Sequence, residues 1–194
     1  DLIEFAREHD LKIGAIADLI AYRREKDRFV ERRMETEVEI AGCKLALSVF
    51  RSIVDDVEHV ALVKGEVDPE RPVRVRMHKV SFADDVLGVD EGRDGLVRRG
   101  VEAIASGDEP GVMVLIRETN RNAIVERFGA RSSEADSERE ARRLREYGIG
   151  AQILIDLGVK RMILLSTAPQ TIIGLDGYGL EVIEQREIEG TPHG

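Results

Sequence analysis

The stretch REYGIGAQILIDLGVKRMILLS, residues 145–166, constrains the fold most, because it places a helical pattern directly before an apolar strand pattern. Gly158 is a typical helix stop, and RMILLS is short and apolar, as buried strands are. A helix that leads straight into a buried strand is a unit of an α/β sheet. One helical face is predicted to hold Leu144, Tyr147, Gly148, Ala151, Leu154 and Ile155.

The first half of the chain shows a period of two instead. Residues 35–40, ETEVEI, alternate acidic side chains with Thr, Val and Ile, and Ala41-Gly42 then leads into KLALSVF, so we predict a β-hairpin. VEHVALVKGEV (57–67) and PVRVRMHKV (72–80) are two further strands, with Asp68-Pro69 as a turn between them. The chain therefore predicts an α/β fold, a mixed sheet flanked by helices, with an N-terminal β-hairpin region.

The remaining elements follow from shorter signals. Two short helices and a charged linker are predicted for residues 2–28, and a Gly- and Asp-rich loop for residues 88–95. Leu96, Val97, Val101 and Ile104 indicate a helix that Gly107 and Pro110 close, and VMVLI (112–116) a buried strand. Residues 130–143 form a polar loop and a charged helix start, capped by Ser133 or Ser137. Residues 169–177 form a short helix or turn, and residues 178–185 a last strand.

Charge and composition narrow the classes of partner. The net charge is −9, which repels a phosphate backbone, so we expect no nucleic-acid binding. A single cysteine, Cys43, supports neither an intramolecular disulfide nor a multi-cysteine zinc site and fits a reducing cytoplasm. No apolar run reaches the length of a membrane helix, so no membrane partner is expected. The chain lacks an initiating Met, and we expect it to be part of a longer protein.

Two segments resemble enzymes that are often fused in bacteria for riboflavin biosynthesis. DLIEFAREHDLKIGAIADLIAYR resembles the last helices of 3,4-dihydroxy-2-butanone 4-phosphate synthase. Residues 35–187 resemble GTP cyclohydrolase II, most strongly in EHVALVKGEV, LREYGIGAQILIDLGVKRMILLS and GLDGYGLEVIEQREI. The resemblance implies a synthase tail and linker over residues 1–28, a GTP cyclohydrolase II-like domain over residues 29–194, and a homodimer.

The resembled enzyme opens the imidazole ring of GTP with a zinc-activated water, releases formate and cleaves pyrophosphate. With His78 and Gly95 as anchors, its three zinc cysteines align with Ser81, Gly92 and Asp94. Neither Ser nor Gly supplies a thiolate, so we predict no zinc and no other cofactor. The same loop carries Asp84, Asp85, Asp90, Glu91 and Asp94, which either bind a hard cation or form a solvated acidic loop.

The motif that holds the nucleotide in the family is altered here. LIRETNR (115–121) keeps Arg117 and Arg121, but Leu115 stands for a tyrosine and Thr119-Asn120 for a Glu-Gly pair. The two arginines either bind an anion or pair with nearby acids.

Two further motifs have lost residues that the chemistry needs. The family's D-x-R-x-Y reads RLREY, so Arg145 and Tyr147 are kept while Arg143 replaces an acid that serves acid/base or orienting roles. Arg145 is thus a vestige of the catalytic site, and Gly148 and Gly150 are expected to allow close helix packing. In STAPQT (166–171), Ser166 keeps a hydroxyl, whereas the position of a phosphate-binding lysine is Thr171.

Arg76 and His78 match an Arg and a His that help to place the triphosphate in the family. The resemblance therefore implies a catalytically impaired domain with a structural or regulatory role, with no intact catalytic residue. The alternatives are a regulatory domain that binds GTP or another phosphate ligand, through Arg76, His78, Arg117, Arg121 and Ser166, and a residually active cyclohydrolase that uses a different metal. Arg139, Arg142 and Arg143 form a basic helix stripe that serves the same ligand or pairs with Glu138 and Glu140.

Overall fold

The structure is a computed structural model, and it describes residues 2–14, 22, 28–90, 93, 95–129, 136–167 and 178–188. The helices are α1 (Leu2–Glu8), the short π-helix η1 (Phe82–Val86), α3 (Leu96–Ala105), α4 (Ala123–Phe128) and α5 (Asp136–Asp156). The strands are β1 (Val30–Ile40), β2 (Cys43–Ser52), β3 (Glu58–Lys64), β4 (Val73–Lys79), β5 (Gly111–Ile116), β6 (Arg161–Ser166) and β7 (Glu181–Glu187).

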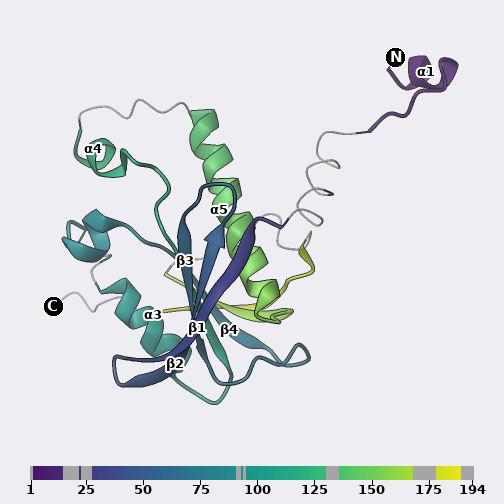
Figure 1. Cartoon of the computed structure of the whole chain (residues 1–194). Coiled ribbons are helices and arrows are strands. Elements are labelled where there is room, and N and C mark those ends of the chain that lie inside the picture. The colour runs from purple at the N-terminus through teal and green to yellow at the C-terminus, as the bar shows by residue number, and fades with distance from the viewer. Residues whose placement is uncertain are drawn as a thin grey trace.

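These strands form one mixed sheet in the order β1-β2-β3-β5-β4-β6-β7 (Figure 1). Strands β1, β2, β3 and β5 pair antiparallel, whereas β5, β4, β6 and β7 run parallel to one another. The predicted α/β class and the antiparallel pairs in the first half are confirmed. Because β5 inserts between β3 and β4, the turn at Asp68 does not close a hairpin, although Arg71 N donates to Asp68 O at 3.0 Å.

The predicted hairpin is β1–β2. Ala41 and Gly42 both have positive φ, 53° and 75°, which suits the tight turn whose twist matches the paired strands. Strand β1 begins at Val30, earlier than the alternation from residue 35 indicated. Cys43 starts β2 half-buried, as expected of a small hydrophobe at the edge of the core.

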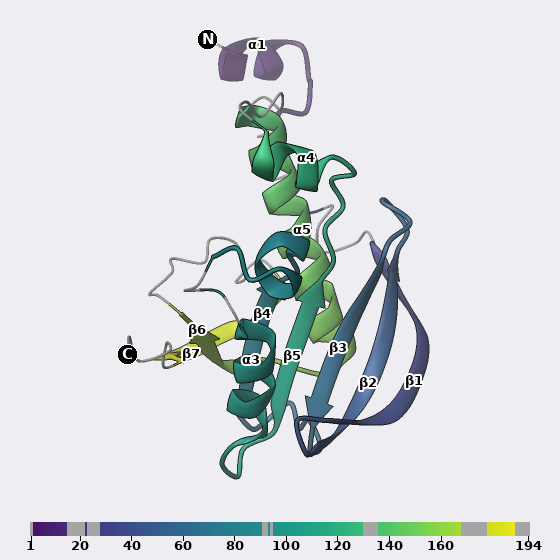
Figure 2. The same cartoon turned by 90° about the vertical axis from the view of Figure 1, so that its left-hand side faces the viewer.

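Helices cover both faces of the sheet; Figure 2 shows α3 in front of it and α5 behind. On one face, Ile149 and Ile153 of α5 pack against Val75 and Val114. On the other face, Val101 and Ile104 of α3 pack with Met113, Leu62 and Leu165. Successive residues of β5 thus serve opposite cores, because strand side chains alternate between faces.

The predicted apolar face of α5 is partly wrong. Leu144 and Ile155 are exposed, whereas Ile149 and Ile153, which were not predicted, are fully buried. The close packing expected of the glycines is confirmed: a Cβ on Gly148 would lie 2.9 Å from the Tyr178 hydroxyl, and one on Gly150 would clash with Met77. Gly150 therefore brings α5 down onto β4.

Other elements depart from the expectations or fall outside the described residues. Helices η1 and α4 were not predicted, and the second N-terminal helix, residues 169–177 and the cap at Ser133 or Ser137 lie outside what the structure describes. His9 is exposed beside Phe5, as expected of a surface helix residue. Among the described residues, no helix is long and apolar enough to cross a membrane.

Candidate functional site

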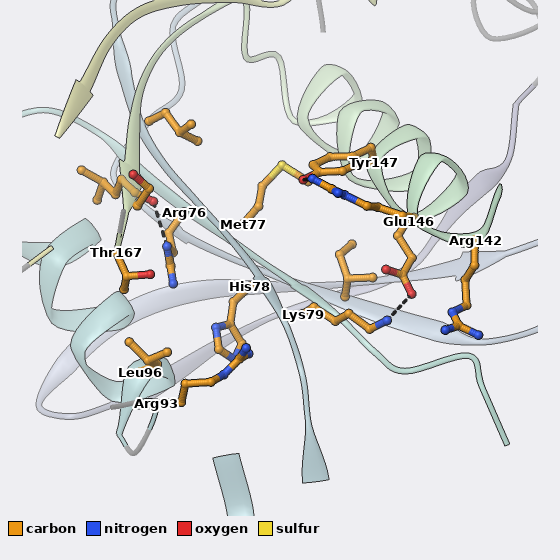
Figure 3. Close-up of a pocket in the computed structure, with 15 residues that line it drawn as sticks. Arg76, Met77, His78, Lys79, Arg93, Leu96, Arg142, Glu146, Tyr147 and Thr167 are labelled. Carbon is orange, nitrogen blue, oxygen red and sulfur yellow. Dashed lines mark hydrogen bonds and ion pairs between the residues drawn. The ribbon is translucent and has the colours of Figure 1, made fainter. Parts of the chain in front are cut away.

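A cavity of about 450 Å³ lies where the carboxyl ends of the parallel strands β4 and β6 meet the first half of α5. Ligands commonly bind at this edge of parallel sheets, because the strand ends leave an open crevice there. The cavity is lined by Arg76, Met77, His78, Lys79, Arg93, Leu96, Ile116, Arg142, Arg143, Glu146, Tyr147, Leu164, Leu165, Ser166 and Thr167. In Figure 3, Arg76, His78 and Arg93 gather at one end, and Lys79, Glu146 and Arg142 at the other.

The lining is strongly basic in a chain whose net charge is −9. Its cations are Arg76, Lys79, Arg93, Arg142 and Arg143, and its one carboxylate is Glu146. A concave surface lined by charges of one sign focuses the field and concentrates ions of the opposite sign. The cavity is therefore suited to an anion.

Arg76 is the buried cation of this cavity, with only 7% of its surface exposed. Its Nη1 donates to Leu165 O at 3.1 Å, while its Nε has no hydrogen-bond partner among the residues that the structure describes. Burial, and then the nearby charge of Arg93, lower the pKa of Arg76 from its usual value. A buried guanidinium with an unused donor would be stabilised by an anion.

His78 lies beside Arg76 and is tied to the loop that follows β4. Its Nε2 lies 2.9 and 3.0 Å from the two carboxylate oxygens of Asp85, and both side chains are buried. Burial lowers the pKa of His78, although the hydrogen bond and charge of Asp85 act in the opposite direction. Asp85 also accepts from Ser81 N at 2.7 Å, so its carboxylate is fully engaged.

Asp84 is buried as well, between two arginines. It lies 3.3 Å from Arg127 Nη2 and 3.5 Å from Arg93 Nε. Both interpretations of the acidic loop, as a cation site or as a solvated loop, are therefore wrong for Asp84 and Asp85, because both carboxylates are buried, Asp84 against two arginines and Asp85 against His78 and Ser81 N. Glu91 and Asp94 lie outside the described residues.

The zinc that the resemblance implies does not fit the donors that this structure offers. The Ser81 hydroxyl accepts from Asp84 N at 3.3 Å and caps η1, and it is a neutral oxygen where a thiolate is needed. The His78 Nε2 faces Asp85 instead of an open position. Over the described ranges, no three His, Cys, Asp or Glu side chains are grouped so that they would hold a metal ion.

The predicted ligand residues separate into two groups. Arg76, His78 and the buried Ser166 meet in the cavity. Arg117 instead points into a shallow depression beside Arg33 and Arg51, and Arg121 is exposed and lines neither hollow.

The residues of the helix motif RLREY (143–147) also separate, because only some of them line the cavity. Arg145 does not line the cavity and instead pairs with Asp55 at 3.1 Å. Arg143 and Tyr147 stay in the wall, with the guanidinium 5.6 Å from the centre of the Tyr147 ring. The side chains of Arg139 and Glu140 lie outside the described residues, so of the predicted stripe only Arg142 and Arg143 are seen to reach the cavity.

Three charged residues of the lining were not assigned to the site from the sequence. Lys79 lies 2.7 Å from Glu146 Oε1 and 3.2 Å from Glu118 Oε2. Burial raises the pKa of Glu146, and Lys79 only partly offsets this. Arg93 comes from the loop and carries no periodic signal, while Glu146 follows Arg145 on α5 and is turned about 100° from it around the helix axis, so that Glu146 lines the cavity and Arg145 does not.

Comparison with known proteins assigns the chain to a family. Residues 29–187 match the model of the family described as GTP cyclohydrolase II. "Riboflavin biosynthesis protein RibBA" of Synechocystis sp. is 36% identical over 197 residues, which cover 95% of this chain and 35% of that protein. "Monofunctional riboflavin biosynthesis protein RIBA 2, chloroplastic" of Arabidopsis thaliana is 35% identical, over 98% of this chain and 41% of that protein.

A solved structure shares the fold. The crystal structure of RibBX, described as a two-domain 3,4-dihydroxy-2-butanone 4-phosphate synthase from A. baumannii, superposes with a TM-score of 0.58 at 30% identity. The match covers 97% of this chain and 48% of that chain. The chain thus spans half or less of the length of these relatives. By its sequence match, its mixed sheet and its helices, the chain belongs to the GTP cyclohydrolase II family.

Proposed function

We propose that the chain is a catalytically impaired GTP cyclohydrolase II-like domain of a riboflavin biosynthesis protein, kept for a structural or regulatory role. The observation that carries this proposal is the rebuilt loop after β4. Where zinc would be bound, His78 faces Asp85, the Ser81 hydroxyl caps η1, and Asp84 forms ion pairs with Arg93 and Arg127. Without a metal-activated water, hydroxide is scarce at neutral pH and attack on an imidazole ring is slow.

The wall formed by α5 supports the same proposal. The acid expected beside Tyr147 is Arg143, whose guanidinium cannot accept a proton. Arg145, the vestige of the catalytic site, is held by Asp55 outside the cavity. The loss of a single contact that stabilises a transition state often costs about 10²–10³ in rate, so these combined losses would leave little turnover.

The names of two relatives agree with a non-catalytic role for such a domain. The Arabidopsis protein is called monofunctional, and the A. baumannii protein is called a two-domain synthase although about half of it resembles this chain. By analogy with these names, we propose an upstream synthase domain in the full-length protein.

A GTP turnover assay tests the proposal. We expect the purified chain, incubated with GTP and either zinc or magnesium, to release no formate above a blank, while added formate is recovered in full. Turnover of about 1 s⁻¹ or faster, within the usual range of enzymes, would overturn impairment. Stoichiometric zinc or magnesium in the purified protein would also contradict it.

Arg76 favours a second candidate, a regulatory domain that binds a phosphate-bearing ligand. Titration calorimetry with pyrophosphate, GTP and a flavin nucleotide is expected to show binding by the wild type and by Arg121→Ala, which lies outside the cavity. Arg76→Met is expected to bind at least about tenfold more weakly, since charge-assisted hydrogen bonds to phosphate are lost. If none of these ligands produces heat, the cavity is not a phosphate site.

A further inference from the structure

One carboxylate lies in a cavity whose other charged lining residues are cations. Among the described residues only Glu146 supplies it, and it lies at the end of the cavity opposite to Arg76 (Figure 3). The side chain of Glu146 is 14% exposed, and its Oε1 accepts a hydrogen bond from Lys79 Nζ at 2.7 Å. Its Oε2 has no hydrogen-bond partner within the part of the chain that the structure describes. The cavity wall therefore holds a carboxylate oxygen that can still accept a hydrogen bond.

Lys79, the partner of Glu146, is shared with a second carboxylate. Glu118 Oε2 lies 3.2 Å from Lys79 Nζ, while Glu118 Oε1 accepts from Asn120 N at 2.9 Å. Because Lys79 already faces two carboxylates, it offers a further anion little net attraction. An anion that drew Lys79 away would leave Glu146 as an unpaired and mostly buried charge, which is strongly unfavourable.

The opposite end of the cavity has the reverse chemistry. Arg76 is 7% exposed, its Nη1 donates to a backbone carbonyl, and its Nε has no acceptor among the described residues. Arg93 lies at the same end (Figure 3). The cavity thus combines an unused donor on a cation at one end with an unused acceptor on a carboxylate at the other. A ligand that matches both ends carries an anion on one side and O–H or N–H groups on the other.

The charge of Glu146 depends on the groups around it. Burial raises the pKa of Glu146, and the charge of Glu118 acts in the same direction. The hydrogen bond and charge of Lys79, and the charge of Arg142 on the same helix, lower that pKa. The cations of this end therefore already face a carboxylate. At about pH 8, far above the usual range of a glutamate, Glu146 is ionised and a phosphate monoester carries its full charge.

We propose that Glu146 determines which phosphate ligand the cavity takes: a phosphate monoester whose anion meets Arg76 and whose far end donates O–H or N–H groups to Glu146, and not a ligand with phosphates at both ends. This inference rests on phosphate binding, the second candidate function above. A hydroxyl at the far end donates to the unused oxygen of Glu146, whereas a second phosphate meets a like charge there. Like charges brought together in a binding site lower affinity, and such repulsion is a common source of specificity.

Titration calorimetry with two fructose phosphates at about pH 8 tests the proposal. Fructose 6-phosphate and fructose 1,6-bisphosphate differ only in the phosphate on one terminal hydroxyl. We expect the wild type to bind the monophosphate at least about threefold more tightly. Glu146→Gln keeps the shape of the side chain without its charge, so it should shift the ratio of the two Kd values at least about tenfold toward the bisphosphate.

Glu118→Gln is the matched control, because Glu118 also contacts Lys79 but does not line the cavity. It should shift the ratio by less than about threefold. A wild type that prefers the bisphosphate overturns the proposal without any substitution. An unchanged ratio in Glu146→Gln, or an equal shift in Glu118→Gln, overturns it as well.

Pyrophosphate separates this inference from the function on which it rests. If pyrophosphate binds and neither fructose phosphate does, or if both bind without preference, the role of Glu146 is refuted while phosphate binding stands. If none of the three ligands binds, the phosphate site and the role of Glu146 are both refuted.

Discussion

At the scale of single residues, Arg76 holds a charge where water is excluded. Burial lowers its pKa, and while its Nη1 donates to Leu165 O, its Nε has no acceptor among the described residues. Gly100 of α3 lies against its stem: a Cβ at Gly100 would lie 3.5 Å from Arg76 Cγ and 2.7 Å from Cε of Met113 on β5. The fold has thus made room for a long side chain that is costly without an anion, which is expected of a binding residue rather than of a structural one.

This balance predicts that Arg76→Met separates stability from binding. Methionine fills similar space without a buried charge, and replacing buried charges by apolar groups is often neutral or stabilising. In phosphate-free buffer, we expect the free energy of unfolding by urea to stay within about 1 kcal/mol of the wild type or to exceed it. A loss of more than about 3 kcal/mol would indicate that Arg76 is a structural residue.

His59 makes stability depend on pH. It is fully buried, accepts a hydrogen bond from Arg117 N through Nδ1 at 3.2 Å, and burial lowers its pKa from 6.5 to about 4. Between these two values the unfolded chain binds the proton more readily than the folded one, so stability is complete above pH 6.5 and is lost as the pH falls toward 4. The loss from this group is roughly 3 kcal/mol at most.

The measurement is urea unfolding of the wild type and of His59→Gln at several pH values from about 7 to 4. Gln offers an oxygen to Arg117 N but does not titrate, so the difference between the two curves isolates His59 from His78. The gap should narrow as the pH falls. Parallel curves would show that His59 titrates alike in the folded and unfolded chains.

At the scale of elements, Asp84 joins η1, α4 and the loop that carries Arg93. We expect Asp84→Asn to lower the free energy of unfolding by about 2 kcal/mol, below the 3–5 kcal/mol of a fully buried pair because both arginines are half exposed. Backbone amides of η1 and α4 should then exchange hydrogen faster. Asp56→Asn, which removes the exposed pair with Arg51, is the control and should cost less than about 1 kcal/mol. Equal costs would deny Asp84 this joining role.

Metal removal gives a second prediction for these elements. Because Arg93 and Arg127 engage Asp84, and His78 engages Asp85, dialysis against a strong chelator should change Tm by less than about 1 °C. A structural zinc contributes several kcal/mol to folding, so a chelator would then lower Tm by many degrees. Scanning calorimetry before and after chelation, with added zinc as the return step, measures this.

The elements also show how far sequence reasoning reaches. The β1–β2 hairpin and the α5–β6 unit were predictable because their periods of two and 3.6 are local. Strand order was not predictable, since placing β5 between β3 and β4 depends on which strands pair over long separations. Helices η1 and α4 were not predicted because they are too short to show a helical period, and because most of their large apolar residues are exposed instead of buried.

At the scale of the whole molecule, the convergence of distant strands explains the candidate site. The resemblance to the family grouped Arg76, His78 and Ser166, and the structure brings them together at the carboxyl ends of β4 and β6. Arg117 could not be separated from them, because it follows β5, the strand beside β4, yet its side chain turns to the depression near β1 and β2. Arg93 and Glu146 enter the cavity only through tertiary packing, which no local pattern encodes.

The contrast between an acidic molecule and its basic cavity predicts how a phosphate ligand and salt affect the stability of the whole chain. Inorganic pyrophosphate should stabilise the folded state by RT ln(1 + [L]/Kd), about 2.7 kcal/mol at 100 times Kd, or roughly 5–10 °C in Tm for a chain of this size. The net charge of −9 repels pyrophosphate at long range, whereas the basic cavity attracts it at short range. Added salt screens both the repulsion and the attraction. The attraction between paired charges inside the cavity is the stronger of the two, so Tm at fixed pyrophosphate should fall as sodium chloride is raised.

Scanning fluorimetry with a binding dye, at low and high salt, measures the shift in the wild type, Arg121→Ala and Arg76→Met. Arg121→Ala should follow the wild type and Arg76→Met should show little shift; equal shifts in all three would mean that pyrophosphate stabilises the chain from somewhere other than this cavity.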